Sequence, residues 1–566
     1  MYFDTPVAVP DKPGKMTFRQ RGESVYVSYE HGRTYDPERK YTLVKRTTVG
    51  KLVDPADRSL MYPNANFGVF FPDEVPDERP EASRSGCLRF GTWAVMRKIA
   101  GERGLGSILS DVAGEVGGGL ALDLAAYSLV TEGNAAQHYP AYAFSHPLFT
   151  PGMRMYSDSK VSEFLHDLGR EAPPAFLSMW NAAHDHREKI WISYDSTNKD
   201  CQAGDLEMVE PGHAKSGGTG PVVNVSIAYD RTNSEPLFYE EYPGSVVDVS
   251  QLQCMLEKAA AYGYRHCGFI LDRGYFSRSN ISYMDEHGYP FVMMVKGMSK
   301  LVSSMIDERR GSFECDRDCF VREYSAYGTT LERPLYAGDK KTRCFHLFFS
   351  AARAASERAA VERRLNRLAD ALKRAEGKRH EMSAAESRYF EGVYAKDGTL
   401  LFARERCEVS KRELELCGYF AIVTSGEMSA RDALLLYKGR DASEKLFTGM
   451  KSFLGGDCLR VHSDESVAGK LMVEFVALIL RNRMHWLLRE RAAASDKKAN
   501  YMTVPAAVAE LEKIEVVRQA DGVYRLDHAV TATQREILAA FGMDDADIKR
   551  IARELGDELG HTGKGE

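Results

Sequence analysis

The chain has 566 residues with a formal net charge of −6, and 44% of them are hydrophobic and 28% charged. Such a length exceeds what one hydrophobic core usually supports, so we expect about three or four domains. The balanced composition is that of a globular protein, not of a low-complexity chain. The slightly negative total argues weakly against a nucleic-acid partner, but a sum over the whole chain hides local charge.

The charge is unevenly distributed along the chain. Residues 12–51 carry 10 Lys and Arg against 4 Asp and Glu, a net charge of +6. Residues 52–83 carry 2 against 7, a net charge of −5, and residues 353–379 carry 9 against 4, a net charge of +5. Basic runs of this kind are typical of solvated faces and also of surfaces that bind phosphate groups.

The ten cysteines are scattered and form no CxxC motif. Cys315 and Cys319 would supply only half of a zinc site, because no second pair has suitable spacing. The first residues lack the apolar core of a signal peptide, and no apolar run is long enough to span a bilayer. We therefore expect a cytoplasmic protein with no membrane partner.

The sequence pattern of the N-terminal third changes twice, and it divides this part of the chain into three segments. Alternating apolar residues predict a basic, β-rich segment over residues 1–60, and several prolines and acids predict a linker over residues 61–88. Apolar spacing close to 3.6, with glycines at the expected helix ends, predicts a helical domain over residues 89–175. This helical domain is a candidate for binding DNA ends.

Residues 176–299 follow an α/β pattern. The runs KIWISYD, PVVNVSIAYD and EPLFYEEYP predict a three-stranded antiparallel meander. A helix (VSQLQCMLEKAAAYG), a buried strand (FILD), a second helix and a further strand (FVMM) follow. The order βββαβαβ is that of an RNase H-like core.

Residues 300–428 interrupt this core and predict a mixed β and helical insertion. Within it, apolar residues recur at helical spacing at Val361, Leu365, Leu368, Leu372 and Ala375. This spacing favours one amphipathic helix packed on the insertion over a coiled coil that dimerises. Residues 429–495 return to helix as the second part of the core, and residues 496–566 form a C-terminal region that is a candidate for dimerisation.

Two aspartates stand at the ends of predicted core strands: Asp195 in YDST and Asp272 in ILDRG. In an RNase H-like sheet the two strands are neighbours, which brings both carboxylates to one place. Paired carboxylates repel each other, and a hard divalent cation such as Mg²⁺ relieves that cost. A lone Asp at a strand end is more often a turn or cap residue, so the pair needs a third element.

That element is the spacing Tyr-x2-Arg-x3-Glu-x6-Lys, formed by Tyr437, Arg440, Glu444 and Lys451. On one helix, Arg440 lies four residues before Glu444 and Lys451 seven after it, so the three share a face. A carboxylate between two cations suits a phosphodiester site. The spacing alone would equally fit a solvent-exposed helix face with an ion pair between Arg440 and Glu444.

The signature resembles that of bacterial DDE insertion-sequence transposases with a β-rich insertion before the catalytic glutamate. The blocks YDSTN, PLFYEEYPGSVVD, ILDRGYFS, GYFAIVTS and YKGRDASEKLFTGMKS also match that group's pattern, over about residues 90–540. The resemblance implies a metal-binding triad of Asp195, Asp272 and Glu444. It also implies contacts from Tyr437, Arg440 and Lys451 to the transposon end.

The same resemblance implies the reaction, the cofactors and the partners. Two Mg²⁺ ions, replaceable by Mn²⁺, would assist cleavage of the transposon strand and attack of the new 3′-OH on target DNA. The partner would be double-stranded DNA, bound by a homodimer. One feature departs from the group: no tryptophan falls in residues 300–428, which puts a hairpin pathway in doubt, and Tyr336 is not singled out as a substitute.

Two other functions share these features. An RNase H-like endonuclease would cut DNA without joining it, and a DNA-binding transposase derivative would have lost catalysis. The complete triad argues against the second. His184, Asp185 and His186 form a cluster that is more typical of a loop than of a metal site, and His462 is as typical of a structural role.

Overall fold

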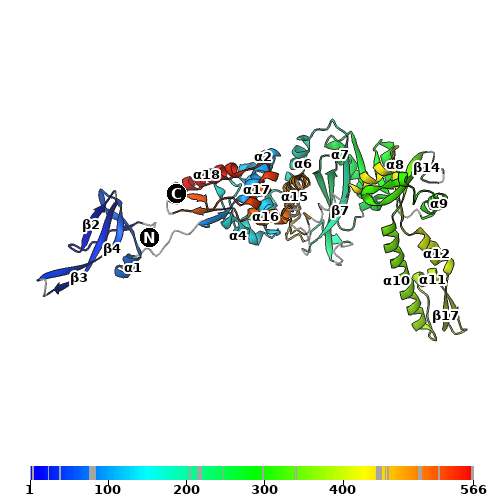
Figure 1. The fold of residues 1–566 in the computed structure, drawn as a ribbon, viewed down its shortest axis with the longest axis horizontal. Coiled ribbons are helices and arrows are strands. Elements are labelled where there is room, and N and C mark those ends of the chain that lie inside the picture. Colours follow the sequence, from blue (N-terminus) through cyan, green and yellow to red (C-terminus); the bar gives the residue numbers. More distant parts are fainter. Residues whose placement is uncertain are drawn as a thin grey trace. The chain divides into compact units, whose positions relative to one another are not determined.

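The computed structural model divides the chain into two compact units, Met1–Ser85 and Gly86–Glu566 (Figure 1). The residues that it describes are 2, 6–22, 24–36, 40–74, 84–201, 203, 206–212, 220–246, 248–295, 299–336, 338–339, 341–440, 446, 449–450, 452, 454–455, 458–494, 500–519 and 523–562. In these residues no helix has the length and apolar composition needed to cross a membrane.

The N-terminal unit is a five-stranded antiparallel sheet with one helix. Its strand order is β1 (Val7–Ala8), β5 (Asp57–Pro63), β4 (Tyr41–Asp54), β3 (Ser24–Asp36) and β2 (Met16–Arg21). Helix α1 (Ala65–Phe70) begins at Asn64, whose side chain accepts a hydrogen bond from the backbone of Asn66. Phe67 and Phe71 pack into the core of this unit. The predicted linker therefore does not start at residue 61, because these aromatic residues are part of the hydrophobic core of the N-terminal unit.

The helical region predicted for residues 89–175 is confirmed as a set of packed helices. These are α2 (Gly91–Glu102), α3 (Leu105–Thr131), α4 (Tyr139–Ser145), α5 (Asp158–Asp167) and α6 (Ala172–Ala182). Helix α3 is interrupted at Gly114, where φ is +75°. The long helix α15 (Asp464–Ala493) packs against α2, α3, α5 and α6, so two regions far apart in the sequence share one core.

The C-terminal region belongs to the same core. Strand β19 (Glu515–Arg518) pairs with β20 (Tyr524–Leu526) on one side and with β6 (Cys87–Arg89) on the other. Helices α16 (Val504–Leu511), α17 (Ala532–Ala540) and α18 (Asp545–Thr562) lie close to α2 (Figure 1). Residues 500–562 thus complete the helical region, and their role in dimerisation stays a prediction.

One large sheet carries the predicted α/β core. Its first five strands, in spatial order, are β10 (Glu235–Pro243), β9 (Pro221–Asp230), β7 (Ile190–Asp200), β11 (Cys267–Leu271) and β12 (Phe291–Met294). The pairs β10–β9 and β9–β7 are antiparallel, and β7–β11 and β11–β12 are parallel. Helix α7 (Asp248–Ala261) precedes β11 and α8 (Arg278–Glu286) precedes β12, so the elements follow the predicted order βββαβαβ apart from the additional two-residue strand β8 (Glu210–Pro211), which pairs with β9.

The sheet does not end where the insertion was predicted to begin. Strands from residues 300–428 continue it beyond β12 in the order β18 (Tyr419–Thr424), β15 (Thr342–Phe349), β14 (Ala326–Pro334) and β13 (Phe320–Val321). The reason is burial: most side chains of β15 and β18 are buried on both faces, as in the interior of a sheet covered on both sides.

A smaller group from the same region has its own core. It consists of α10 (Ala351–Ala375), α11 (Ala384–Tyr389), α12 (Cys407–Leu416) and the hairpin β16 (Phe390–Tyr394) and β17 (Leu400–Glu405), which extends away from the sheet in Figure 1. Val361, Leu365 and Leu372 of α10 are buried against Tyr389 and Leu400. The apolar face of this helix is thus covered within the chain, as the amphipathic interpretation predicted.

Candidate active site

The two predicted aspartates lie on neighbouring parallel strands. Ile190 of β7 pairs with Cys267 of β11, and the register continues to Tyr194 and Leu271. One further step along both strands places Asp195 beside Asp272. Asp272 directly follows β11 and caps a short turn, where its Oδ1 accepts a 2.7 Å hydrogen bond from the backbone N–H of Arg273. The predicted adjacency of these two residues is therefore confirmed.

Helix α13 (Ala430–Lys438) and the residues after it bring Tyr437 and Arg440 close to Asp195 and Asp272. Ser429 caps the helix by accepting a hydrogen bond from the backbone of Asp432, and Leu434 packs with Tyr437 against Ile270 and Val292 of the sheet. This packing fixes the C-terminal end of α13 over the ends of the strands.

One guanidinium contacts both aspartates. Arg440 Nη1 donates to Asp195 Oδ2 at 3.0 Å, and Arg440 Nη2 lies 3.8 Å from Asp272 Oδ1. Tyr437 Oη donates to the same Asp272 oxygen at 3.4 Å. The three charged side chains are only 13% (Arg440), 17% (Asp195) and 33% (Asp272) exposed. Limited access to water strengthens these charge-assisted contacts relative to a surface ion pair.

The donor set around Arg440 fits a divalent cation. Two carboxylates beside one guanidinium leave a net charge of −1 within a few ångströms, and carboxylate oxygens are the ligands that Mg²⁺ and Mn²⁺ prefer. Within the described ranges, no group of three or more acidic, His or Cys side chains is suited to a metal ion. Glu444 and Lys451 lie outside the described residues, so the third carboxylate and the second cation stay predictions.

The structure places the Arg231 side chain against Gly439, next to Arg440 in the chain, which the sequence did not indicate. Arg231 follows the last residue of β9, and its backbone N–H donates to Trp191 O at 2.8 Å. A Cβ at position 439 would come within 2.5 Å of Arg231 Nε. Gly439 has φ −57°, so its conformation does not require glycine, and the missing side chain instead leaves room for Arg231 beside Arg440. The only signal was the glycine in YKGR, which resembles an ordinary helix end.

The histidines of the His184–His186 cluster contact neighbouring residues of the fold. His184 Nδ1 donates to Trp180 O at 2.7 Å and its Nε2 lies 3.1 Å from Glu235 Oε1, while His186 Nε2 donates to Asn181 O at 2.9 Å. Tyr336 is partly buried, and the Arg278 guanidinium lies 5.3 Å from the centre of its ring. Cys315 and Cys319 are free thiols.

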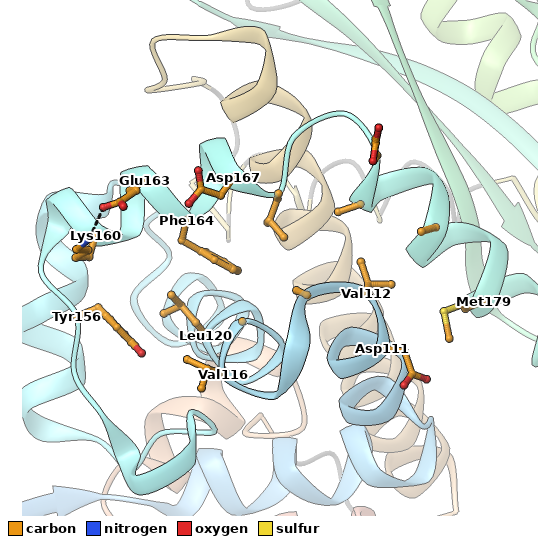
Figure 2. A pocket seen from close by; sticks show the side chains of 16 residues that line it. Asp111, Val112, Val116, Leu120, Tyr156, Lys160, Glu163, Phe164, Asp167 and Met179 are labelled. Carbon is orange, nitrogen blue, oxygen red and sulfur yellow. Dashed lines mark hydrogen bonds and ion pairs between the residues drawn. The ribbon is translucent and has the colours of Figure 1, made fainter.

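A large groove lies elsewhere in the second unit. Its volume is about 750 Å³, and residues of α3, α5 and α6 form it, with Leu120 and Phe164 on its floor (Figure 2). Four acids and one lysine stand along it: Asp111, Glu163, Asp167, Glu171 and Lys160, and Lys160 pairs with Glu163. None of the aspartate-site residues lines this groove, and its negative charge is unsuited to DNA phosphates.

Asp272 follows the end of β11 as predicted, but Asp195 lies in the middle of β7, which continues to Asp200. These two strands and α13 thus form a site with two adjacent carboxylates held by an arginine, which is an arrangement suited to phosphoryl chemistry. The family model of the transposase DDE domain matches residues 192–480, which are 289 of the 566 residues. The chain belongs to this family and is a DDE transposase. The match includes both aspartates and the whole Tyr-Arg-Glu-Lys signature.

No curated protein matches the chain. Among solved structures, the chain is similar to one titled "Cryo-EM structure of piggyBac transposase synaptic complex with hairpin DNA", with 8% identity and a TM-score of 0.32. That similarity covers 84% of this chain and 75% of the other. A TM-score this low supports no statement about the fold or the function.

Proposed function

We propose that this transposase cleaves the DNA ends of a bacterial insertion sequence and joins the resulting 3′-OH to target DNA. The observation that carries the proposal is the Arg440 guanidinium in contact with both Asp195 and Asp272. The order β10-β9-β7-β11-β12, with two parallel pairs at one end, supports an RNase H-like core. The signature around Tyr437 and Arg440 supports the bacterial insertion-sequence group.

In this proposal Asp195, Asp272 and Glu444 hold two divalent ions, Mg²⁺ or Mn²⁺. When bound, such ions activate the attacking oxygen and stabilise the leaving oxygen of an in-line displacement at phosphorus. Tyr437 orients the Asp272 carboxylate through its hydroxyl. Arg440, held in place by the two aspartates, presents further N–H donors to a phosphate beside the scissile bond, and its planar fork suits two phosphate oxygens.

The proposed DNA contacts extend beyond the aspartates. The solvent face of α10 carries Arg358, Arg363, Arg367, Lys373 and Arg374, all exposed, while the opposite face is buried. A basic face on a helix that projects from the sheet suits the phosphate backbone of a duplex, through contacts that do not depend on base sequence. Pairing of two transposon ends calls for two copies of the chain, so we expect a homodimer in the DNA complex.

A strand-transfer assay tests the proposed function against cleavage alone. The full-length protein is incubated with Mg²⁺, a target plasmid and a pre-cleaved DNA end taken from the sequence that flanks the gene. We expect a product in which the 3′-OH of the end is joined to the plasmid. Cleavage of uncut ends without any joined product would instead assign the chain to the RNase H-like endonucleases.

Lys451→Ala is expected to weaken binding to the DNA end and to lower its dependence on salt. Each lost phosphate contact removes about 0.9 from the slope of log K against log [salt]. Fluorescence anisotropy at several salt concentrations measures this slope for the wild type and the variant. Lys549→Ala, an exposed lysine of α18, serves as the control. If the slope for Lys451→Ala equals that of the wild type, Lys451 makes no phosphate contact.

A further inference from the structure

A second polar site is buried in the Gly86–Glu566 unit, apart from the two aspartates. It is a cavity of about 280 Å³ formed by α3, α5, the segment from Arg460 to Ser463 and the first half of α15. Its walls combine apolar side chains with hydroxyl, amide and charged groups. The polar and charged side chains of the cavity wall include Asn134, Arg460, Lys470 and Glu474.

Both oxygens of Glu474 accept hydrogen bonds from residues other than Lys470. Its Oε2 accepts a hydrogen bond from Lys199 Nζ at 2.6 Å, and these two side chains are 2% and 0% exposed. Its Oε1 accepts from Asn134 Nδ2 at 3.1 Å. Asn134 Oδ1 in turn accepts from Arg460 Nη1 at 3.0 Å. The single negative charge of Glu474 is thus matched by the positive charge of Lys199.

Two cations, Arg460 and Lys470, line the cavity together with Glu474. Lys470 is only 4% exposed, yet it makes no hydrogen bond or ion pair with any residue that the structure describes. Burial lowers the pKa of Lys470 to about 8, Glu474 opposes this shift, and the positive charges of Lys199 and Arg460 add to it. Glu474 is the one acid among the described residues that line the cavity.

The charge balance of the cavity is therefore positive. The Lys199–Glu474 pair is neutral, so Arg460 and Lys470, the two cations that line the cavity, leave a net charge of +2 around a space open to a small ligand. Because Lys199 already neutralises Glu474, the charge of the buried Lys470 ammonium is only partly compensated, and an anion that enters the space removes the remaining cost. The hydroxyls of Ser128, Ser162 and Ser466, which also line the cavity, provide neutral donors for the oxygens of such an anion.

We propose that this cavity binds a phosphate group through Lys470 Nζ and the Arg460 guanidinium. The proposal does not depend on the transposition chemistry at Asp195 and Asp272. The phosphate group has two sources, a phosphodiester of DNA or a free phosphate compound, and both offer the same oxygens to the two cations. Lys199, which pairs with Glu474 of the cavity wall, lies on β7 four residues after Asp195 on the same face of the strand, so this pair connects the cavity to the strand that carries Asp195.

Binding of inorganic phosphate to the full-length protein tests the proposal. Isothermal titration calorimetry in a chelating buffer without divalent metal compares the wild type with Lys470→Met, which keeps the length of the side chain and removes its charge. We expect saturable binding by the wild type and a loss of affinity of at least tenfold in Lys470→Met. Lys549→Met, which removes an exposed lysine of α18, should bind phosphate like the wild type.

Two additional arms complete the experiment. Arg460→Gln is measured as a second variant, so that failure of Lys470→Met to fold, seen in thermal unfolding, does not decide the outcome. A short DNA duplex is then added to the phosphate-loaded protein: displacement of phosphate identifies DNA as the source, and retention identifies a free phosphate compound. Equal phosphate affinity in the wild type and in the folded cavity variants overturns the proposal, as does an absence of saturable binding by the wild type.

Discussion

Replacing Asp272 by asparagine is expected to reduce cleavage of the transposon end by about 1,000-fold or more. The variant removes a negative charge from the pair that Arg440 contacts, and the loss of several kcal/mol of transition-state stabilisation corresponds to this factor. The fold should survive, because an asparagine oxygen can accept the same hydrogen bond from the backbone of Arg273. Gel analysis of a labelled DNA end with Mg²⁺ measures the rate.

The matched control for this experiment is Asp111→Asn, which removes an exposed carboxylate of α3 in the acidic groove. It should cleave at the rate of the wild type. Binding of the uncut DNA end should be unchanged or tighter in Asp272→Asn, because a negative charge near phosphates has been removed. A cleavage rate within tenfold of the wild type would show that Asp272 is not part of the catalytic site.

Glu444→Gln is expected to abolish cleavage while binding to the DNA end is largely retained. This variant tests the residue that the structure does not describe, four positions beyond Arg440. A carboxylate that completes the set of Asp195 and Asp272 is a metal ligand, and its amide counterpart is a poor one. Cleavage is measured as for Asp272→Asn, and binding is measured by fluorescence anisotropy.

Two results would decide whether Glu444 belongs to the active site. The control Glu490→Gln, an exposed glutamate near the end of α15, should leave cleavage unchanged. Unchanged cleavage by Glu444→Gln would remove this residue from the site and leave Asp195 and Asp272 without the predicted third acid. Loss of DNA binding together with cleavage would instead indicate that Glu444 supports the local fold.

Much of the fold near the aspartates could be predicted because it depends on local patterns. Alternation and burial in KIWISYD and FILD indicate strands. Two antiparallel connections return β10 to the direction of β7, and the crossover through α7 then makes β11 parallel to both. Asp195 and Asp272 meet because the register of β7 and β11 places them at the same level, although β7 continues to Asp200. Apolar spacing in α10 likewise indicated which of its faces is buried.

Other features depend on partners that no local pattern specifies. The strands β15 and β18 were recognisable as strands, but their position beside β12 follows only from the pairing of the complete sheet. The Arg231 side chain lies against Gly439 because the turn after β9 and the end of α13 come together there. Lys199 and Glu474 are 275 residues apart, and no sequence pattern near either residue predicts that the two form an ion pair.

The sequence by itself predicted the strands and helices around the aspartates and the signature that includes Arg440, because local spacing and side-chain chemistry decide them. The adjacency of Asp195 and Asp272 could be expected only by assuming the strand order of an RNase H-like sheet. The tertiary structure alone decided that Arg440 contacts both aspartates, that the sheet continues through β13, and that Lys470 is buried beside Arg460. Those contacts join distant segments, and they form only where the packing of the whole unit offsets the entropy of ordering the chain.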